Sequence, residues 1–177
     1  MPPRLVIFDM DDVLCHYDLG RRLRALSQIS GKTPRDIRAA IWDSGFEDDA
    51  DSGGYPDADV YLAEFSYRIG HTITRQQWIA ARRDSMIPSG DVLALAEAIG
   101  KVSRLAIYTN NGPIVKSSLD ELFPEAAAIF KKRHRILIQP FPFFNNIGIV
   151  HEVGSFFVDH QYHGLGIEDI AYLVTGF

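Results

Sequence analysis

The apolar run Leu5–Phe8 constrains the fold of this chain more than any other stretch, because it leads directly into three carboxylates. Its unbroken apolar character, with β-branched members, is typical of a parallel strand that is buried on both faces. Asp9, Asp11 and Asp12 follow the run within four residues. Open parallel sheets bind ligands at the carboxyl ends of their strands. The stretch therefore predicts a buried strand that delivers acidic side chains to a ligand site.

Two further apolar runs end in polar residues in the same manner. One leads into Thr109 and Asn110 after a helical stretch at 90–100, and the other, near the C-terminus, leads into Asp159. Strands that alternate with helices imply a parallel sheet with right-handed crossovers. We therefore expect an open α/β core in which these three strand ends converge.

A helical block interrupts this alternation directly after the first strand. Four segments between about 19 and 86 have helical patterns, and Thr33 and Thr74 are the expected N-caps of two of them. The acidic, glycine-containing stretch 46–59 is expected to be a loop. We interpret the block as a helical domain of residues 16–87, inserted into a core that comprises residues 1–15 and 88–177.

Composition excludes several classes of partner. A chain of 177 residues with 46% hydrophobic content can bury one core with a small insert, and its net charge of −5 gives no electrostatic footprint for nucleic acid. No apolar stretch reaches the length of a membrane span, and the N-terminal run is too short for a signal peptide. Cys15 is the single cysteine, so we expect no internal disulfide and a reducing, cytoplasmic location.

The carboxylates indicate a metal site. Carboxylates that lie within a few ångströms of one another repel, which raises their pKa values unless a cation neutralises them. Mg²⁺ prefers oxygen ligands and completes its coordination with water and substrate phosphate. An ionised aspartate, Mg²⁺ and a hydroxyl beside free backbone amides are suited to phosphoryl transfer through an aspartyl-phosphate. The sequence therefore predicts a magnesium and phosphate site.

The same residues resemble known motifs. "VIFDMDDVL" resembles motif I of the haloacid dehalogenase (HAD) superfamily, "LAIYTNNG" is similar to its motif II, and the helical block resembles the cap that some members insert after motif I. The resemblance implies a Rossmann-like parallel sheet core with a small, mobile α-helical cap domain. It also implies Mg²⁺-dependent hydrolysis of a phosphate monoester of a small metabolite.

The resemblance assigns a role to each candidate residue. Asp9 is the expected nucleophile, and Asp11 is the expected general acid and base. Asp9, the backbone carbonyl of Asp11 and the carboxylate of Asp159 are the expected metal ligands. Thr109 and the amide of Asn110 are expected to hold the phosphoryl oxygens.

Asp11 separates two chemistries within the superfamily. Dehalogenases expel a halide, which needs no proton, and they lack an acid two positions after the nucleophile. Phosphatases need that acid because an alkoxide is a poor leaving group. Asp11 therefore favours a phosphatase over a dehalogenase. Asp12 stands where the superfamily commonly has glycine, and we expect it to be an exposed acid.

The C-terminal motifs depart from the family pattern. Gln139, at the start of "QPFPFF", stands where the motif III lysine is expected, and a neutral amide does not supply the same charge stabilisation. His160 and His163 occupy the two places in which motif IV would carry its second acid, and we expect neither to bind Mg²⁺.

The composition of the chain changes in the same region. No lysine follows Lys132, and the tail after about His134 is either diverged, degenerate or the product of a shifted reading frame. A competing hypothesis therefore stands beside the phosphatase: a catalytically impaired relative that binds a phosphorylated ligand or a protein partner. The sequence is compatible with a monomer or a homodimer.

Overall fold

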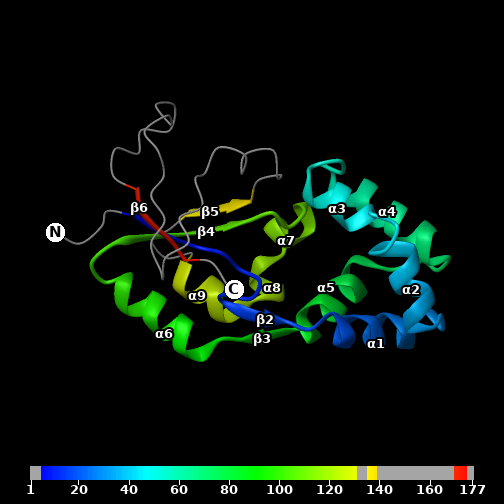
Figure 1. Ribbon diagram of the computed structural model, residues 1–177, viewed down its shortest axis with the longest axis horizontal. Helices are drawn as coiled ribbons and strands as arrows, with labels where there is room; N and C mark the ends of the chain where they lie inside the picture. The colour runs from blue at the N-terminus through cyan, green and yellow to red at the C-terminus, as the bar shows by residue number, and fades with distance from the viewer. Residues whose placement is uncertain (1–4, 131–134, 139–169, 175–177) are drawn as a thin grey trace. The chain divides into compact units, whose positions relative to one another are not determined.

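The computed structural model describes residues 5–130, 135–138 and 170–174 (Figure 1). The chain divides into two compact units, which we call the core unit and the helical unit. The core unit comprises Met1–His16, Pro88–Thr109 and Glu125–Phe177, and the helical unit comprises Tyr17–Ile87 and Asn110–Pro124. In chain order, the helical unit therefore begins shortly after the carboxylate cluster.

A parallel sheet forms the centre of the core unit, as predicted. Its four strands have the order β5-β4-β1-β6, and each neighbouring pair is parallel. The strands are β1 (Leu5–Phe8), β4 (Arg104–Thr109), β5 (Arg135–Ile138) and β6 (Ile170–Val174). With its helices this sheet makes the core an α/β fold, which confirms the predicted fold class.

The register of β1 against β4 sets the position of the candidate site. The pairing runs from Leu5 opposite Arg104 to Phe8 opposite Ile107. Asp9 follows β1 immediately, and Thr109 is the last residue of β4, so both lie at the carboxyl edge of two adjacent strands. The strand expected before Asp159 lies outside the described residues. Within the described part of the chain, β6 is the second neighbour of β1.

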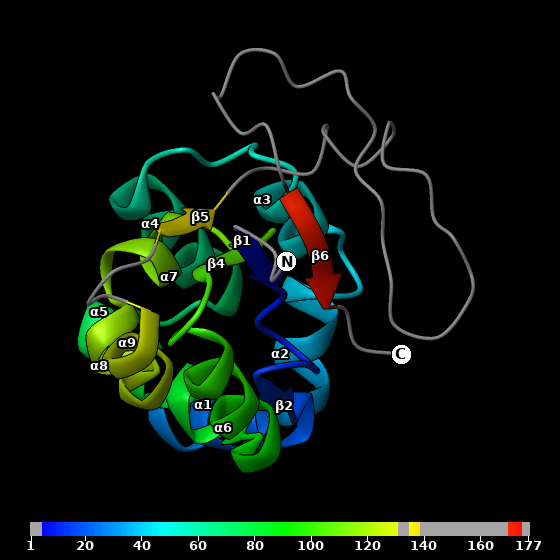
Figure 2. The same cartoon turned by 90° about the vertical axis from the view of Figure 1, so that its left-hand side faces the viewer.

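Two helices cover one side of this sheet, as Figures 1 and 2 show from two directions. They are α6 (Gly90–Ile99) and α9 (Pro124–Phe130), the latter beginning at the last residue of the helical unit. The ring of Phe130 meets the ring of Phe8 edge to face, with 5.8 Å between centroids. Both side chains are fully buried. This contact anchors the end of β1, one residue before Asp9.

The chain passes between the units in a two-stranded sheet of β2 (Cys15–Tyr17) and β3 (Met86–Pro88). The part of the helical unit between these strands in the sequence has five helices: α1 (Leu19–Ser30), α2 (Pro34–Ile41), α3 (Phe46–Asp51), α4 (Ala58–Ile69) and α5 (Arg75–Asp84). Two short helices, α7 (Pro113–Ser117) and α8 (Leu119–Leu122), belong to the same unit.

The predicted N-caps are confirmed. The amide of Asp36 donates to the Thr33 hydroxyl at 3.2 Å, and Thr74 forms a reciprocal capping box with Gln77. Helix α1 packs against α2 and α5. Rings from three helices form the interior of the helical unit: Phe46, Tyr61, Phe65 and Trp78.

One expectation for this unit is wrong. The stretch 46–59 was predicted to be a loop, but its first six residues form α3. Three of the acids that suggested a loop, Glu47, Asp48 and Asp49, lie in the first turn of the helix, where negative charge interacts favourably with the helix dipole. Phe46 and Ala50 are buried and attach this turn to the aromatic interior. The acidic composition therefore conceals a short amphipathic helix.

The segment 110–124 also differs from expectation, because it groups with the helical unit rather than the core. Its contacts with α5 explain the grouping. The Arg75 guanidinium donates to the hydroxyl of Ser118 at 2.8 Å, and Arg83 donates to the carbonyl of Glu121 at 3.2 Å. Helices α5 and α8 also pack together.

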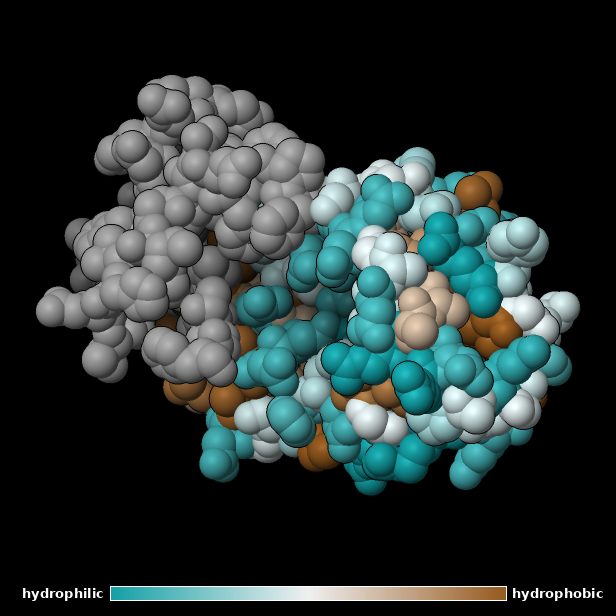
Figure 3. Space-filling model, turned by 45° about the vertical axis from the view of Figure 1, so that its right-hand side comes forward, coloured by the Kyte–Doolittle hydropathy of each residue, from teal (hydrophilic) through white to brown (hydrophobic). Residues whose placement is uncertain are grey.

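One face of the described residues is mostly polar. On the face that Figure 3 shows, hydrophobic side chains form separate small patches among hydrophilic ones. The large apolar residues that are exposed come from α4, β3, α6 and the turn after α6: Val60, Tyr67, Ile87, Leu95 and Val102. No helix within the described ranges is both long enough and apolar enough to span a membrane.

We expect Phe130→Ala to lower the free energy of unfolding by about 3–5 kcal/mol, because it removes the ring that packs on Phe8 and leaves a cavity. Urea denaturation followed by circular dichroism measures the change. The control is Leu95→Ala in α6, where the side chain is 52% exposed and the expected change is within about 0.5 kcal/mol. Equal losses from both substitutions would contradict this account of how β1 is anchored.

Candidate active site

The turn after β1 holds Asp9 through its neighbours. The backbone amide of Met10 donates to Asp9 Oδ1 at 2.6 Å, and the Met10 side chain is fully buried. Asp9 itself is half-buried. Its carboxylate is therefore fixed at the end of a buried strand while part of it stays accessible.

A tight loop then returns the chain toward β2. The carbonyl of Met10 accepts from the amides of Leu14 and Cys15 at 2.9 and 3.1 Å, and Asp11 forms an isolated β-bridge with Cys15. The Cys15 thiol lies 3.7 Å from Asp11 Oδ1, within reach of a weak S–H donor. These contacts fix the backbone of Asp11 two residues after Asp9. Buried Cys15 acts here as a packing residue.

Asp12 adopts a backbone conformation that favours glycine. Its φ is 58°, in the left-handed region that glycine adopts without strain and that aspartate tolerates better than most residues. Its carboxylate is exposed, as predicted, and lies 3.0 Å from Nδ1 of His16. The turn therefore holds an acid in a backbone conformation that glycine adopts most readily.

Burial and like charges act on the nucleophile candidate. Burial raises the pKa of Asp9 to about 6, the Met10 amide opposes that rise, and the charges of Asp11 and Asp12 add to it. A cation beside these oxygens would relieve both the desolvation and the repulsion. The donor set consists of carboxylate and carbonyl oxygens, which fits Mg²⁺.

The described residues contain part of the expected metal site. Among them, no group of three or more His, Cys, Asp or Glu side chains is placed to hold an ion. Asp9 and Asp11 are described, whereas Asp159 lies outside the described residues, as do Gln139, His160 and His163.

The end of β4 contributes Thr109, which is buried. The core unit thus brings Asp9, Asp11 and Thr109 to the ends of adjacent strands. Asn110, the next residue, belongs to the helical unit, where its side-chain amide lies 3.4 Å from Asp51 Oδ2. Its backbone amide, the group predicted to bind phosphate, is not used in that contact.

Two buried arginines of the helical unit were absent from the sequence analysis. Arg22 and Arg82 are 2% and 3% exposed. Arg22 stands four residues before Leu26 on the buried face of α1, and Arg82 stands four residues after Trp78 on that of α5. Each arginine stands at a position where the helical pattern predicts an apolar residue. That departure is the sequence signal that could have revealed them.

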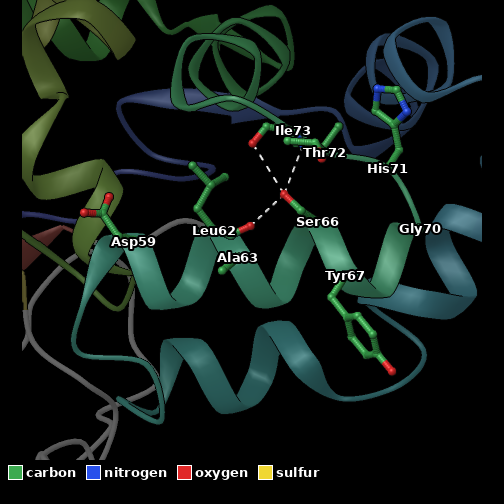
Figure 4. Close-up of a pocket in the computed structure, with 9 residues that line it drawn as sticks. All are labelled: Asp59, Leu62, Ala63, Ser66, Tyr67, Gly70, His71, Thr72 and Ile73. Carbon is green, nitrogen blue, oxygen red and sulfur yellow. Dashed lines mark hydrogen bonds between the residues drawn. The ribbon is translucent and has the colours of Figure 1, made fainter.

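A broader hollow of the helical unit, along α4, offers little chemistry. Figure 4 shows its lining from α4 and the following segment 70–73. The Ser66 hydroxyl at its centre donates to the Leu62 carbonyl at 2.8 Å and accepts from the Ile73 amide at 3.0 Å. Asp59 and His71 lie at opposite ends of the view. The hollow therefore lacks a set of convergent reactive groups.

We expect Asp9→Asn to stabilise the metal-free protein at pH 7.5 by roughly 1–3 kcal/mol, with no such gain near pH 4. Because the folded-state pKa of Asp9 is raised to about 6 from 3.8, the cost of charging it is absent below about pH 4 and complete above about pH 6. Urea denaturation in EDTA at both pH values measures this difference.

A matched control removes the same charge elsewhere. Asp91→Asn removes an exposed carboxylate from the first turn of α6, where negative charge is favourable, so it should not stabilise the protein. The account of Asp9 is wrong if both variants gain stability equally, or if the gain of Asp9→Asn is the same at both pH values.

Comparisons with known proteins identify the fold. No protein-family model matches the sequence, and no curated protein matches it. The structure is similar to that of a predicted HAD-like family hydrolase from Porphyromonas gingivalis, with a TM-score of 0.57 and 21% identity over 78% of this chain and 67% of that chain.

It is also similar to a HAD family enzyme from Bacteroides thetaiotaomicron that was solved with magnesium and inorganic phosphate. That match has a TM-score of 0.56 and 17% identity over 76% of this chain and 68% of that chain. At these identities the likeness establishes the architecture alone. The chain therefore has the fold of the haloacid dehalogenase-like hydrolases, as its first two motifs implied.

Proposed function

We propose that this protein is a Mg²⁺-dependent phosphatase that hydrolyses phosphate monoesters of small metabolites. One observation carries the proposal: Asp9 and Asp11 follow β1, directly beside the strand that ends in Thr109, within a HAD-like fold. The magnesium and phosphate bound to the Bacteroides enzyme belong to that protein, and they support the same ligands here.

In this proposal Asp9 is the nucleophile. One of its carboxylate oxygens attacks the phosphorus, the bond from phosphorus to the ester oxygen breaks, and Asp11 gives its proton to the leaving alkoxide. Asp11 then takes a proton from water as that water attacks the aspartyl-phosphate, which releases phosphate and restores Asp9. The fixed turn between the two residues suits these paired roles.

Three residues are proposed to hold Mg²⁺: Asp9, Asp11 through its backbone carbonyl, and Asp159. Bound Mg²⁺ supplies positive charge that keeps Asp9 ionised and neutralises the phosphoryl group. Thr109 and the backbone amide of Asn110 are proposed to hold the phosphoryl oxygens.

For the helical unit we propose the role of a cap that selects the substrate. We also propose a cytoplasmic location, in keeping with the single cysteine.

Two alternative functions stand beside the phosphatase. A dehalogenase needs no acid at the position of Asp11, so that residue disfavours this chemistry. A catalytically impaired relative that binds a phosphorylated ligand or a protein partner is favoured by Gln139, which stands where a lysine is expected. Strand β5 ends at Ile138, one residue earlier in the chain.

We expect the purified protein to hydrolyse an aryl phosphate only with Mg²⁺, and Asp9→Asn to lower kcat/KM at least about 10³-fold. Asp11→Asn should lower it by about 10²–10⁴-fold with an alkyl phosphate and less with an aryl phosphate, whose leaving group needs less protonation. Steady-state phosphate release measures all of these rates.

The control for this assay is Asp91→Asn, which should retain wild-type activity. Metal-independent turnover, or turnover that survives Asp9→Asn, would overturn the proposed mechanism. Folded protein with no turnover across a panel of phosphorylated metabolites would favour the impaired relative.

We expect Gln139→Lys to raise kcat/KM about tenfold or more, because a cation at this position offsets the negative charge of the nucleophile and phosphate. Gln139→Met is the matched variant, of similar length and without charge, and should give no increase. Equal rates for the lysine and methionine variants would show that residue 139 does not take the motif III role.

A further inference from the structure

The loop 110–112 follows β4 and lies outside helices and strands. Asn110, Asn111 and Gly112 connect Thr109, the last residue of β4, to helix α7. Backbone groups outside regular structure take their hydrogen bonds from side chains or water. In the proposed function the backbone amide of Asn110 binds a phosphoryl oxygen. The contacts that hold this loop therefore bear on phosphate binding.

Side chains from two helices of the helical unit bond to this loop. Nη2 of Arg82, in α5, donates to Oδ1 of Asn111 at 2.9 Å. Arginine only donates hydrogen bonds, so the carbonyl oxygen of the Asn111 side chain has to face it. The side-chain amide of Asn110 lies 3.4 Å from Oδ2 of Asp51, the last residue of α3. Both bonds are assisted by charge, and the Arg82 bond, at an ordinary N–H···O length, is the stronger.

Arg82 is itself held in place by packed neighbours. It is 3% exposed, and the central carbon of its guanidinium lies 4.1 Å from the ring centroid of Tyr17. The Tyr17 hydroxyl in turn accepts from Nη1 of Arg22 at 3.1 Å, which restrains the ring. Helix α5 also packs against α1 and α8. The guanidinium is therefore a fixed donor, supported by neighbours as the groups that position a binding site need to be.

Stability alone would favour an apolar residue at the position of Arg82. It lies on the buried face of α5 with Trp78 and Ile79. Desolvating a guanidinium is costly, and replacing a buried charge by an apolar side chain of similar volume is often neutral or stabilising. An apolar side chain, however, has no donor to direct at Asn111. What arginine adds at this position is a directed hydrogen bond to the loop.

We propose that Arg82 is a positioning residue for phosphate binding. Through Asn111 it fixes the loop 110–112, and thereby the backbone amide of Asn110 that holds a phosphoryl oxygen. The inference rests on the proposed function and deepens it, because the helical unit then supports the phosphate site as well as selecting the substrate. The grouping of residues 110–124 with the helical unit, although they follow a strand of the core, supports this role.

Inorganic phosphate is the probe, and isothermal titration calorimetry of the full chain with Mg²⁺ measures its affinity without turnover. Arg82→Met removes the donor and Asn111→Leu removes the acceptor, so each should weaken phosphate binding about tenfold or more. Since both remove the same contact, the double variant should lose about as much as either single variant. If Arg82 acted independently of Asn111, the two losses would multiply instead.

Two controls separate this contact from the charge of Arg82. Asn111→Leu changes no charge, so its effect does not come from long-range electrostatics. Arg83→Met removes an exposed charge from the next position of α5 and keeps the bond to Asn111, so phosphate affinity should change less than about twofold. In NMR spectra of the metal-free protein, the backbone N–H resonance of Asn110 should shift in Arg82→Met and stay in place in Arg83→Met.

Three results would overturn the inference in a wild-type protein that binds phosphate: unchanged affinity in both loop-contact variants, losses that multiply in the double variant, or an equal loss in Arg83→Met. If Arg82→Met does not fold, as judged by circular dichroism, Asn111→Leu decides, because full affinity in that variant overturns the inference. Failure of the proposed function is distinct: the wild-type protein itself would then bind no phosphate with Mg²⁺, and the inference would fall with it.

Discussion

The parallel pairing of β1 with β4 is the interaction on which the candidate active site depends. It aligns Phe8 with Ile107, so that the residues beyond these partners, Asp9 on one strand and Thr109 on the other, reach the same edge. The ring contact between Phe8 and Phe130 fixes β1 from one side of the sheet. A shift of this register by one residue would turn Phe8 away from the core and move Asp9 with it. Hydrophobic packing therefore sets the position of the charged groups.

That position is unfavourable for a carboxylate on its own. The end of a buried strand desolvates Asp9, and Asp11 and Asp12 add repulsion, which together raise its pKa to about 6. Perturbed pKa values of this kind cluster at functional sites, because a fold keeps an unfavourable charge only where something else stabilises it. In the proposed function this stabilising partner is a divalent cation, which favours oxygen donors.

The sequence predicted the elements whose signals are local. Apolar runs identified β1 and β4, and hydroxyl residues before helical stretches identified the caps at Thr33 and Thr74. The sequence did not predict the elements that depend on tertiary contacts. Helix α3 has an acidic, loop-like composition and is held by the burial of Phe46. The candidate residues follow the same division: Asp9 follows a predicted strand and Thr109 ends one, whereas the burial of Arg22 among aromatic rings depends on tertiary contacts.

Each unit thus contains a charged side chain that burial desolvates. In the core unit it is the Asp9 carboxylate among other acids, and in the helical unit it is the Arg22 guanidinium among aromatic rings. Both are held by well-packed neighbours, Phe8 with Phe130 in one case and Trp78 with Tyr61 in the other. A fold is stable when local propensity, packing and electrostatics agree. The few positions at which they disagree are those where ligands are expected. In the proposed function a cation offsets the charge of the carboxylate, whereas in the helical unit the rings of Trp42 and Trp78 face the guanidinium.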